Sequence, residues 1–573
     1  MTERPGIGGA GRAFLALAAA LALADASIVT LGLPSILVEL DTTVEGVALV
    51  LGVYTAVLAL ALPAAAALSR GLGGARLATA GMALFALTSL ACGLSDSFEL
   101  LLVLRGIQAI GGAGALIGAF ALLEAGAPGP GRRLWFAASI FGAAIGPALG
   151  GALTEAFDWR AIFLAQVPLI APGVVVAARA ALRDAGAEPA AGNGAAPGAA
   201  DLPDSPLRLR PALALALLSA ALTAVIFLVV LLLVAGWSID PLAAALAVSA
   251  LPVAAMAASR IGGNPETRAA AGCILVAGGI GCLALVPAAS AWWTVAPQVL
   301  AGAGMGLALP ALAGELLPER SRRDVARVLA IRHAGIAVAL ALLAPIVSSS
   351  LDETVFQATE EGTAAVLDAE LPPETKIDLA PQLFAGVDTD DPRGQLERSV
   401  IEAREDLDDP AERDELDGLA EQLDDVITGA VRSSFRIAFI VTAAFALAAA
   451  LVMLWGALAP GAWVARRAVA AAAAAAIAAT AAYAVVFAGS ERERIPIADP
   501  CTAQRDLPDT GGIGGALQDL SLEALDRAAC EFGSSREELL LALFDDDARD
   551  RFEDEHGEDP RSPTTIGPAL LGL

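Results

Sequence analysis

The chain consists largely of apolar blocks, each about twenty residues long, separated by short polar joints. A helix rises about 1.5 Å per residue, so a block of this length matches the ~30 Å hydrocarbon core of a bilayer. Of the 573 residues, 56% are hydrophobic and only 17% are charged, whereas soluble domains carry about 25% charged residues. This pattern excludes a soluble enzyme, a nucleic-acid-binding protein and a disordered regulator. It predicts an all-α polytopic membrane protein.

We expect twelve membrane spans and one further, Ala-rich span of lower hydropathy. The first six are residues 14–33, 47–68, 77–94, 100–123, 134–153 and 161–180; the next six are 211–235, 241–258, 269–287, 293–316, 328–348 and 437–455; the Ala-rich block is 468–487. The predicted domains are an N-terminal six-helix bundle (1–182), a cytoplasmic linker (183–210), a C-terminal six-helix bundle (211–458) interrupted by an acidic extracytoplasmic insertion (351–432), an extra transmembrane helix (464–488) and an acidic extracytoplasmic tail (489–573).

The distribution of charge predicts the orientation. Most of the net charge of −27 belongs to residues 351–431 and to the tail, which leaves the membrane part slightly basic. Arginines recur at every second joint, whereas acids occupy the joints between them. Because Lys and Arg collect in cytoplasmic loops, we expect the N-terminus in the cytoplasm and both acidic segments on the opposite side. We read the first block as a retained span and not as a secretory signal.

The two halves of the chain resemble each other at an offset of about 190 residues. The joint that follows Pro63 has a counterpart after Pro252, and Glu124 before paired arginines has a counterpart in Glu315. Six spans followed by six similar spans are the repeat plan of one large class of secondary transporter.

Motifs on three spans resemble the signatures of the major facilitator superfamily, and most closely those of its drug:proton antiporters. They are 24-ADASIVTLGLP-34 on the first span, 104-LRGIQAIGG-112 on the fourth, and 142-GAAIGPALGG-151 followed by 158-DWRAIFL-164 on the fifth and after it. The resemblance implies two six-helix bundles that alternate access to a site between them. Two features depart from the pattern: the two extra central helices of the larger antiporters are missing, and Arg70 stands where the loop after the second span usually has an aspartate.

Asp25 and Arg105 are the candidate proton-coupling and substrate-pathway residues, together with Gln108 one turn beyond Arg105. A charge inside the bilayer costs at least ~2.5–3.5 kcal/mol, so such residues mark partners or water-filled cavities. The resemblance implies a coupling role for Arg105, which here would hold Asp25 ionised. The alternatives are an acid that reaches the headgroups near Pro34 and an arginine that extends to the surface. His333, beside Arg332, is either a proton relay or a surface or capping residue.

Gly142, Gly146 and Gly150 recur every four residues, so they lie on one helix face and allow close helix packing. With Pro147, which weakens the hydrogen-bond ladder, they form either a gating pivot or a plain packing face. Arg70 is the matching candidate in the gating loop. Glu124 and Glu315 at span ends are more simply explained by local salt bridges than by transport.

Cys501 and Cys530 lie in the acidic tail, where a disulfide can persist if the tail is extracytoplasmic. The alternative is two free thiols in a cytoplasmic tail. Short helices are expected in the insertion between prolines, and in the tail from Ser521 to Phe532 and after a capping box that begins at Ser534. These regions are interpreted as a cap, a solvated fringe, a partner-binding surface or a cation-attracting vestibule.

The sequence contains no phosphate-binding loop and no His/Cys cluster with metal-ligand spacing, so we expect no enzyme activity, no cofactor, no metal and no nucleic-acid partner. The first hypothesis is a monomeric, plasma-membrane, proton-coupled exporter of small lipophilic or cationic compounds. Its partners are then the small-molecule substrate, protons and the lipid bilayer. The second hypothesis is a transporter-derived scaffold or sensor that presents the acidic domains without transporting.

Overall fold

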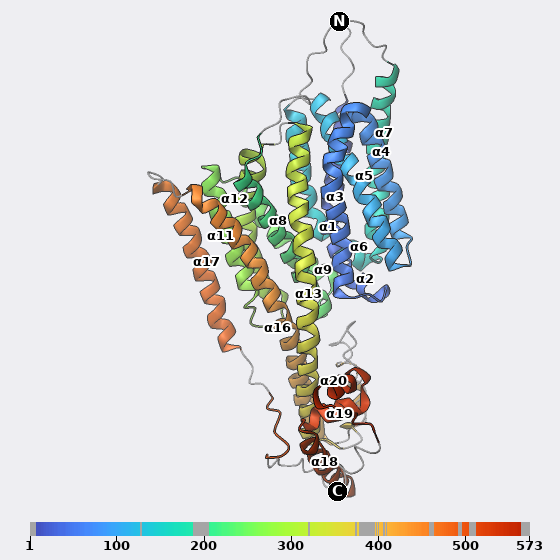
Figure 1. Ribbon diagram of the computed structural model, residues 1–573, viewed down its shortest axis with the longest axis vertical. Coiled ribbons are helices and arrows are strands. Elements are labelled where there is room, and N and C mark those ends of the chain that lie inside the picture. Colours follow the sequence, from blue (N-terminus) through green and yellow to red (C-terminus); the bar gives the residue numbers. More distant parts are fainter. Residues whose placement is uncertain are drawn as a thin grey trace. The chain divides into compact units, whose positions relative to one another are not determined.

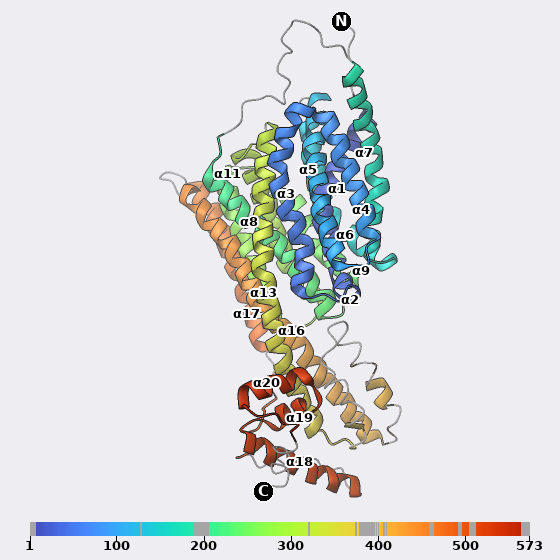
Figure 2. The same ribbon diagram turned by 45° about the vertical axis from the view of Figure 1, so that its right-hand side comes forward.

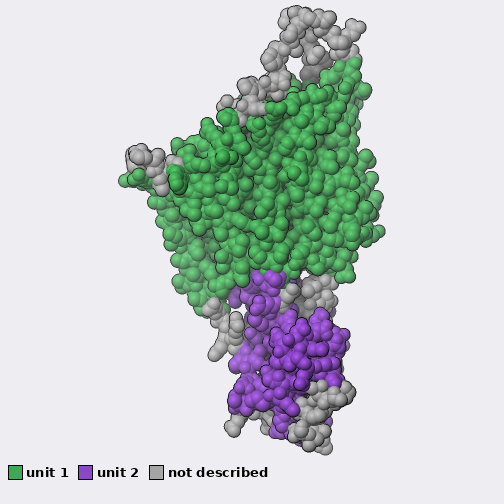
Figure 3. Space-filling model, viewed as in Figure 1, with its two compact units in different colours: residues 1–234, 239–348, 435–490 green, residues 235–238, 349–434, 491–573 purple. Residues whose placement is uncertain are grey.

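The computed structural model describes residues 7–126, 129–186, 206–318, 321–372, 375–376, 396, 398, 400–404, 407, 409–457, 463–490, 495–502 and 512–562. Within these ranges the regular structure is entirely helical, and the chain divides into two compact units (Figure 3). Unit 1 comprises residues 1–234, 239–348 and 435–490, and unit 2 comprises residues 235–238, 349–434 and 491–573. Most of the linker expected at 183–210 lies outside the described residues.

The first half of unit 1 contains seven helices: α1 (Gly9–Thr30), α2 (Leu33–Glu39), α3 (Val44–Leu72), α4 (Gly74–Gly93), α5 (Phe98–Gly126), α6 (Pro130–Ala156) and α7 (Arg160–Gly186) (Figure 1). Helix α1 ends at Thr30, and α2 begins at Leu33 as a separate short helix with Pro34 in its first turn. The Thr43 side chain accepts a hydrogen bond from the Gly46 amide and so caps α3, and Gly73, with φ of 83°, separates α3 from α4. Helices α1, α4, α5 and α7 lie side by side (Figure 2).

The second half of unit 1 begins with α8 (Leu209–Val230), which continues as a π-helical segment, η2 (Leu231–Gly236). It continues with α9 (Pro241–Val248), α10 (Ala250–Ala258), α11 (Pro265–Leu283), α12 (Ala291–Leu309) and the π-helical η3 (Pro310–Leu316). Helix α13 (Arg322–Asp368) begins in this unit and α16 (Pro410–Ala457) ends in it. Helix α17 (Trp463–Gly489) lies beside α11 (Figure 1). The Asn264 side chain caps α11 by accepting from the Thr267 amide.

Twelve helices among the described residues are long and apolar enough to cross a membrane. They include the Ala-rich α17, which was the least certain of the expected spans. Helix α6 is not one of the twelve, although its 27 residues are long enough. Its apolar part contains residues whose surroundings lie outside the described part of the chain, and its packing against α1 places it in the bundle.

The spans expected at 328–348 and 437–455 extend far beyond their apolar parts. Helix α13 has 47 residues and α16 has 48, so each continues through acidic sequence from the residues of unit 1 into those of unit 2. Helix α13 ends shortly before Pro372 and α16 begins at Pro410, so breaks occur at two of the expected proline positions, but the flanking helices are long and not short. Most of the insertion between them lies outside the described residues. Glu and Ala favour helix without forming an apolar stripe, which hides this continuity in the sequence.

Unit 2 has its own apolar cores. One is built from the ends of α13 and α16 around Leu371, Leu416 and Leu419. The other joins three helices of the tail, α18 (Gly512–Phe532), α19 (Arg536–Phe544) and α20 (Asp546–His556). The cap of α19 is Ser535, one residue after the predicted Ser534, because the Ser535 hydroxyl accepts from the Glu538 amide.

Candidate functional site

A buried polar network crosses the interior of the first six-helix half. Arg105 on α5 donates from Nη1 to Asp25 Oδ2 on α1 at 2.6 Å, and both side chains are fully buried. The same nitrogen donates to Gln108 Oε1, one turn further along α5, at 2.6 Å. The structure thus brings the three predicted residues together. Arg105 lies inside the protein and does not extend to the surface.

Two residues that the sequence analysis did not single out complete the network. Gln166 on α7 donates from Nε2 to Asp25 Oδ1 at 3.0 Å, so both carboxylate oxygens of Asp25 accept a hydrogen bond. Gln108 Nε2 donates to Ser89 Oγ on α4 at 2.8 Å and lies 3.3 Å from Gln166 Oε1. A side-chain amide in the middle of an apolar span is costly unless it is hydrogen-bonded. Gln166 could therefore have been recognised in the sequence as a polar residue that needs a buried partner.

Helix α3 holds the guanidinium from a third side. Arg105 Nε donates to the Val50 carbonyl at 3.2 Å, and its guanidinium carbon lies 4.4 Å from the centroid of the Tyr54 ring. A desolvated cation over an aromatic face gains about 2 kcal/mol or more. Tyr54 is itself fixed by donating to the Ala22 carbonyl of α1 at 2.8 Å. Among the described residues Nη2 of Arg105 has no hydrogen-bond partner, so the network retains one unused donor.

The opposite face of α1 lines a cavity between the two halves of unit 1. Its walls come from α1, α8, α10, α12 and α13 and comprise Leu23, Ala26, Ser27, Thr30, Ser219, Leu222, Thr223, Ile226, Leu251, Pro252, Met305, Leu309, Arg332, His333 and Ile336. At 100° per residue, Asp25 points about 150° away from the α1 residues in this wall. The cavity measures about 60 Å³, against ~300–1,000 Å³ for sites of drug-sized ligands, so this state holds the halves close together.

The predicted glycine face of α6 lies directly against α1. A Cβ on Gly146 would approach Ser27 Cβ to 2.8 Å, and a Cβ on Gly150 would collide with the Ile28 carbonyl. Pro147 lies inside α6 between these two positions and is buried. Gly142 lies on the same helix, but its surroundings are outside the described part of the chain. Helix α1 therefore has Asp25 on one face and lines the cavity with another. It packs closely against α6 because Gly146 and Gly150 have no side chains.

At the joint between α3 and α4, the contact between the halves is made by Ser69 and not by Arg70. Arg322, at the start of α13, donates to the carbonyl of Ser69 at 3.2 Å and to its hydroxyl at 3.3 Å, whereas Arg70 is exposed. Glu124 and Glu315, the acids at the ends of two spans, form local salt bridges, as the sequence analysis expects. Glu124 lies 3.5 Å from Arg132, and Glu315 lies 2.5 Å from Arg268.

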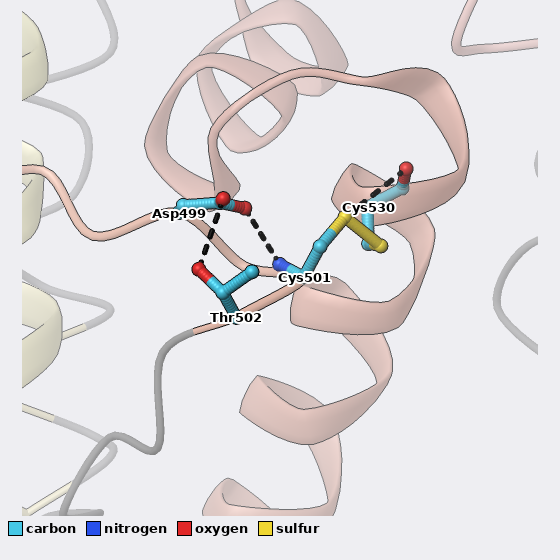
Figure 4. The surroundings of a disulfide bond; sticks show 4 residues. All are labelled: Asp499, Cys501, Thr502 and Cys530. Carbon is cyan, nitrogen blue, oxygen red and sulfur yellow. Dashed lines mark hydrogen bonds between the residues drawn. A yellow bond between two sulfur atoms is a disulfide. The ribbon is translucent and has the colours of Figure 1, made fainter.

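In unit 2 the structure joins Cys501 and Cys530 in a disulfide, the pair for which the sequence suggests a bridge (Figure 4). The Asp499 carboxylate accepts hydrogen bonds from the Cys501 amide and the Thr502 hydroxyl, which fixes the turn before the bridge. The bridge ties the start of the tail to α18.

Comparison with known proteins places the chain in a family. The family model described as Major Facilitator Superfamily matches residues 15–339, more than half of the chain. Multidrug resistance protein Stp of Mycobacterium tuberculosis is 33% identical over 150 residues, which are 25% of this chain and 28% of that protein. The methylenomycin A resistance protein of Streptomyces coelicolor is 31% identical over 170 residues, 29% of this chain and 36% of that protein.

Among solved structures, a bacterial homologue of the human lysosomal transporter Spinster, inward-facing and unoccupied, aligns at 16% identity and a TM-score of 0.49 over 78% of this chain and 98% of that one. The curated relatives are matched over only about a third of their own length. The family model, however, extends into both halves of the bundle and includes the polar network and every residue of the cavity wall. The chain is therefore a multi-pass membrane protein that belongs to the major facilitator superfamily.

Proposed function

We propose that this protein is a secondary active transporter that exports small lipophilic or cationic compounds in exchange for protons. The observation that carries the proposal is the position of α1 between a fully buried acid–base pair and a cavity between the two halves. Multidrug resistance and efflux proteins among the relatives support the class of substrate.

In the proposed cycle, Asp25 is the proton acceptor. A proton on Asp25 removes the negative charge that compensates Arg105, and an uncompensated buried charge is strongly destabilising. Because Gln166 and Arg105 both bond to this carboxylate, protonation weakens the contacts of α1 with α5 and α7 together. Helix α1 then shifts on the smooth face of α6, which changes the shape of the cavity wall on its other side. The proton and the substrate thus act on one helix from opposite faces.

We further propose a plasma-membrane location, a cytoplasmic N-terminus and a monomer. The basic joints support this orientation, because Arg132, Arg268 and Arg322 all lie at helix ends on alternate joints. The same orientation places the acidic insertion (351–432) and the acidic tail (489–573) on the extracytoplasmic side of the membrane.

Transport into everted vesicles with an imposed pH gradient and a panel of dyes tests the proposal. Asp25→Asn should abolish gradient-driven uptake while the protein still inserts. Glu124→Gln is the matched control, because it removes a buried carboxylate that pairs with an arginine at a joint away from the network. Full uptake by Asp25→Asn would remove Asp25 from the mechanism.

A second candidate function is a scaffold or sensor that does not transport. Unit 2 favours it, because this unit has two apolar cores and a disulfide of its own. Deleting residues 352–425 separates the two functions: transport that survives the deletion counts against the scaffold, and a loss of partner binding with transport intact supports an additional role for unit 2.

A further inference from the structure

The tail of unit 2 contains a helical hairpin with a histidine at one end. Helix α19 is followed by α20 after a single residue, Asp545, whose carboxylate caps α20 by accepting a hydrogen bond from the Ala548 amide at 2.7 Å. The two helices lie side by side (Figure 2). This arrangement brings the first turn of α19 beside the last turn of α20, where His556 Nε2 lies 3.0 Å from Glu538 Oε1.

Glu555, next to His556 on α20, completes a group of three side chains. One oxygen or nitrogen atom from each of Glu538, Glu555 and His556 lies within 4.8 Å of the other two. The ligand atoms of a four-coordinate zinc ion lie ~2.0–2.2 Å from the metal and so about 3.4 Å from one another. Small side-chain rotations would therefore convert the group into three ligands. Glu555 is exposed, and the side chains of Glu538 and His556 are 12% and 16% exposed, so an ion can reach all three from solvent.

The imidazole distinguishes this group from a patch of acids. Its ring centroid lies 4.4 Å from that of Phe552, one turn earlier on α20, and Phe552 is fully buried in the core of the tail. Packing therefore fixes the position of His556 before any ligand binds. A neutral imidazole nitrogen together with carboxylate oxygens suits Zn²⁺, whereas Ca²⁺ and Mg²⁺ prefer oxygen ligands alone. The negative end of the helix dipole of α20 also favours a cation here.

The surroundings of the group contain more acid than base. Glu360 on α13 accepts no hydrogen bond within the described part of unit 2, and burial, with three glutamates of α19 and α20, raises its pKa to about 7. The opposing base is Arg551, whose guanidinium carbon lies 4.0 Å from the centroid of the Phe356 ring. A bound cation stabilises carboxylates that repel one another at a half-buried position.

We propose that Glu538, Glu555 and His556 form a zinc-binding site in unit 2, with water as the fourth ligand. The ion would join the first turn of α19 to the last turn of α20 and offset the repulsion around Glu360. The sequence analysis expected no metal because the ligands are not a His/Cys cluster and come from opposite ends of two helices. The site neither requires nor follows from the proposed transport activity.

Zinc titration of the full chain tests the site. The protein, without an affinity tag, is placed in lipid nanodiscs and treated with a chelator that is then removed. Isothermal titration with ZnCl₂ and with CaCl₂, corrected for empty nanodiscs, should show one zinc ion bound per chain, at least about tenfold more tightly than calcium. No saturable zinc binding, or tighter binding of calcium, would overturn the inference.

Matched variants assign the binding to these residues. Glu555→Gln removes one ligand at an exposed position, where the change should not disturb folding, and should weaken zinc binding at least about tenfold. Glu553→Gln makes the same change at another exposed position of α20 and should leave zinc binding unchanged. Equal zinc affinity in these two variants would refute the site.

The role of the histidine has a separate test. The chain has two histidines, and His556→Gln leaves only His333, in the cavity wall. Co²⁺ in place of zinc should give the visible absorption of a four-coordinate site, and zinc should slow amide exchange in α19 and α20. Both effects should be lost in His556→Gln. Zinc protection of the hairpin that persists in this variant would show that the acids alone bind the ion, which would overturn the ligand set.

Discussion

Replacing Asp25 by Asn and Arg105 by Gln, singly and together, measures how strongly the buried pair is coupled. The Nη1–Oδ2 distance is 2.6 Å and neither side chain is exposed. Removing one partner of such a pair costs about 3–5 kcal/mol, because the other charge stays buried without compensation. Removing both leaves two neutral amides in the same space, so the double variant should lose no more than about 2 kcal/mol. The expected coupling energy is therefore about 4 kcal/mol or more.

The assay is reversible unfolding in mixed micelles, combined as a double-mutant cycle. A second ion pair of the same chain gives the control. Arg160 and Glu39 lie at the same 2.6 Å separation but are 25% and 42% exposed, and exposed pairs contribute only about 0–1 kcal/mol. Additive losses for Asp25 and Arg105, within about 0.5 kcal/mol, would refute the reasoning, as would equal coupling in the two pairs.

Three further outcomes follow from the packing and charge described above. Gly150→Leu should abolish transport by forcing α6 off α1, whereas Gly52→Leu, whose Cβ would meet open space, should leave transport intact; comparable losses in uptake would contradict a role for the contact. Glu360 lies in unit 2, beyond the apolar part of α13, and burial, with three glutamates of α19 and α20, raises its pKa to about 7. Between about pH 4.5 and 7 the folded unit holds a proton on Glu360 that the unfolded chain has lost, so the free energy of unfolding of unit 2 falls as pH rises through this range. Glu360→Gln should therefore stabilise unit 2 at pH 8 by about 1–2 kcal/mol after allowance for solvent screening. A pH profile of thermal unfolding that is the same in the variant and the unchanged protein would contradict this. Arg322→Ala should widen the spin-label distance between the start of α13 and the end of α3, whereas Arg70→Ala should leave that distance unchanged; identical distances in both variants would show that the Ser69 contact does not hold the halves.

The sequence predicted the spans well because hydropathy in blocks of twenty is a strong signal. It placed α17 and found Asp25 and Arg105, since a charge in an apolar block has few explanations. It missed Gln166 and Ser89 because a polar uncharged residue costs less and its partner lies on another helix. The cavity wall also escaped prediction, because it is set by which faces of five helices meet.

Unit 2 shows a different limit. Helix α20 contains one buried apolar side chain, Phe552, among dense charges, so no periodic stripe reveals it. The position of α20 depends on contacts with another segment, because the Phe552 ring packs edge-on against Phe532 of α18. The neighbouring α19 is likewise held by Arg536, which pairs with Asp368 of α13 at 2.7 Å. Contacts between residues so distant in sequence cannot be predicted from a local sequence pattern.

The separation of Asp25 from the cavity by the thickness of one helix has a consequence for energy conversion. In the proposed cycle, the proton and the substrate bind on opposite faces of α1 and do not compete for the same atoms, so coupled exchange would depend on the stiffness of α1. A substitution that weakens the packing of α1 on α6, but leaves Asp25 and the cavity wall unchanged, would then let protons cross the membrane without substrate. The dissipated gradient would then appear as a futile proton leak in the absence of cargo.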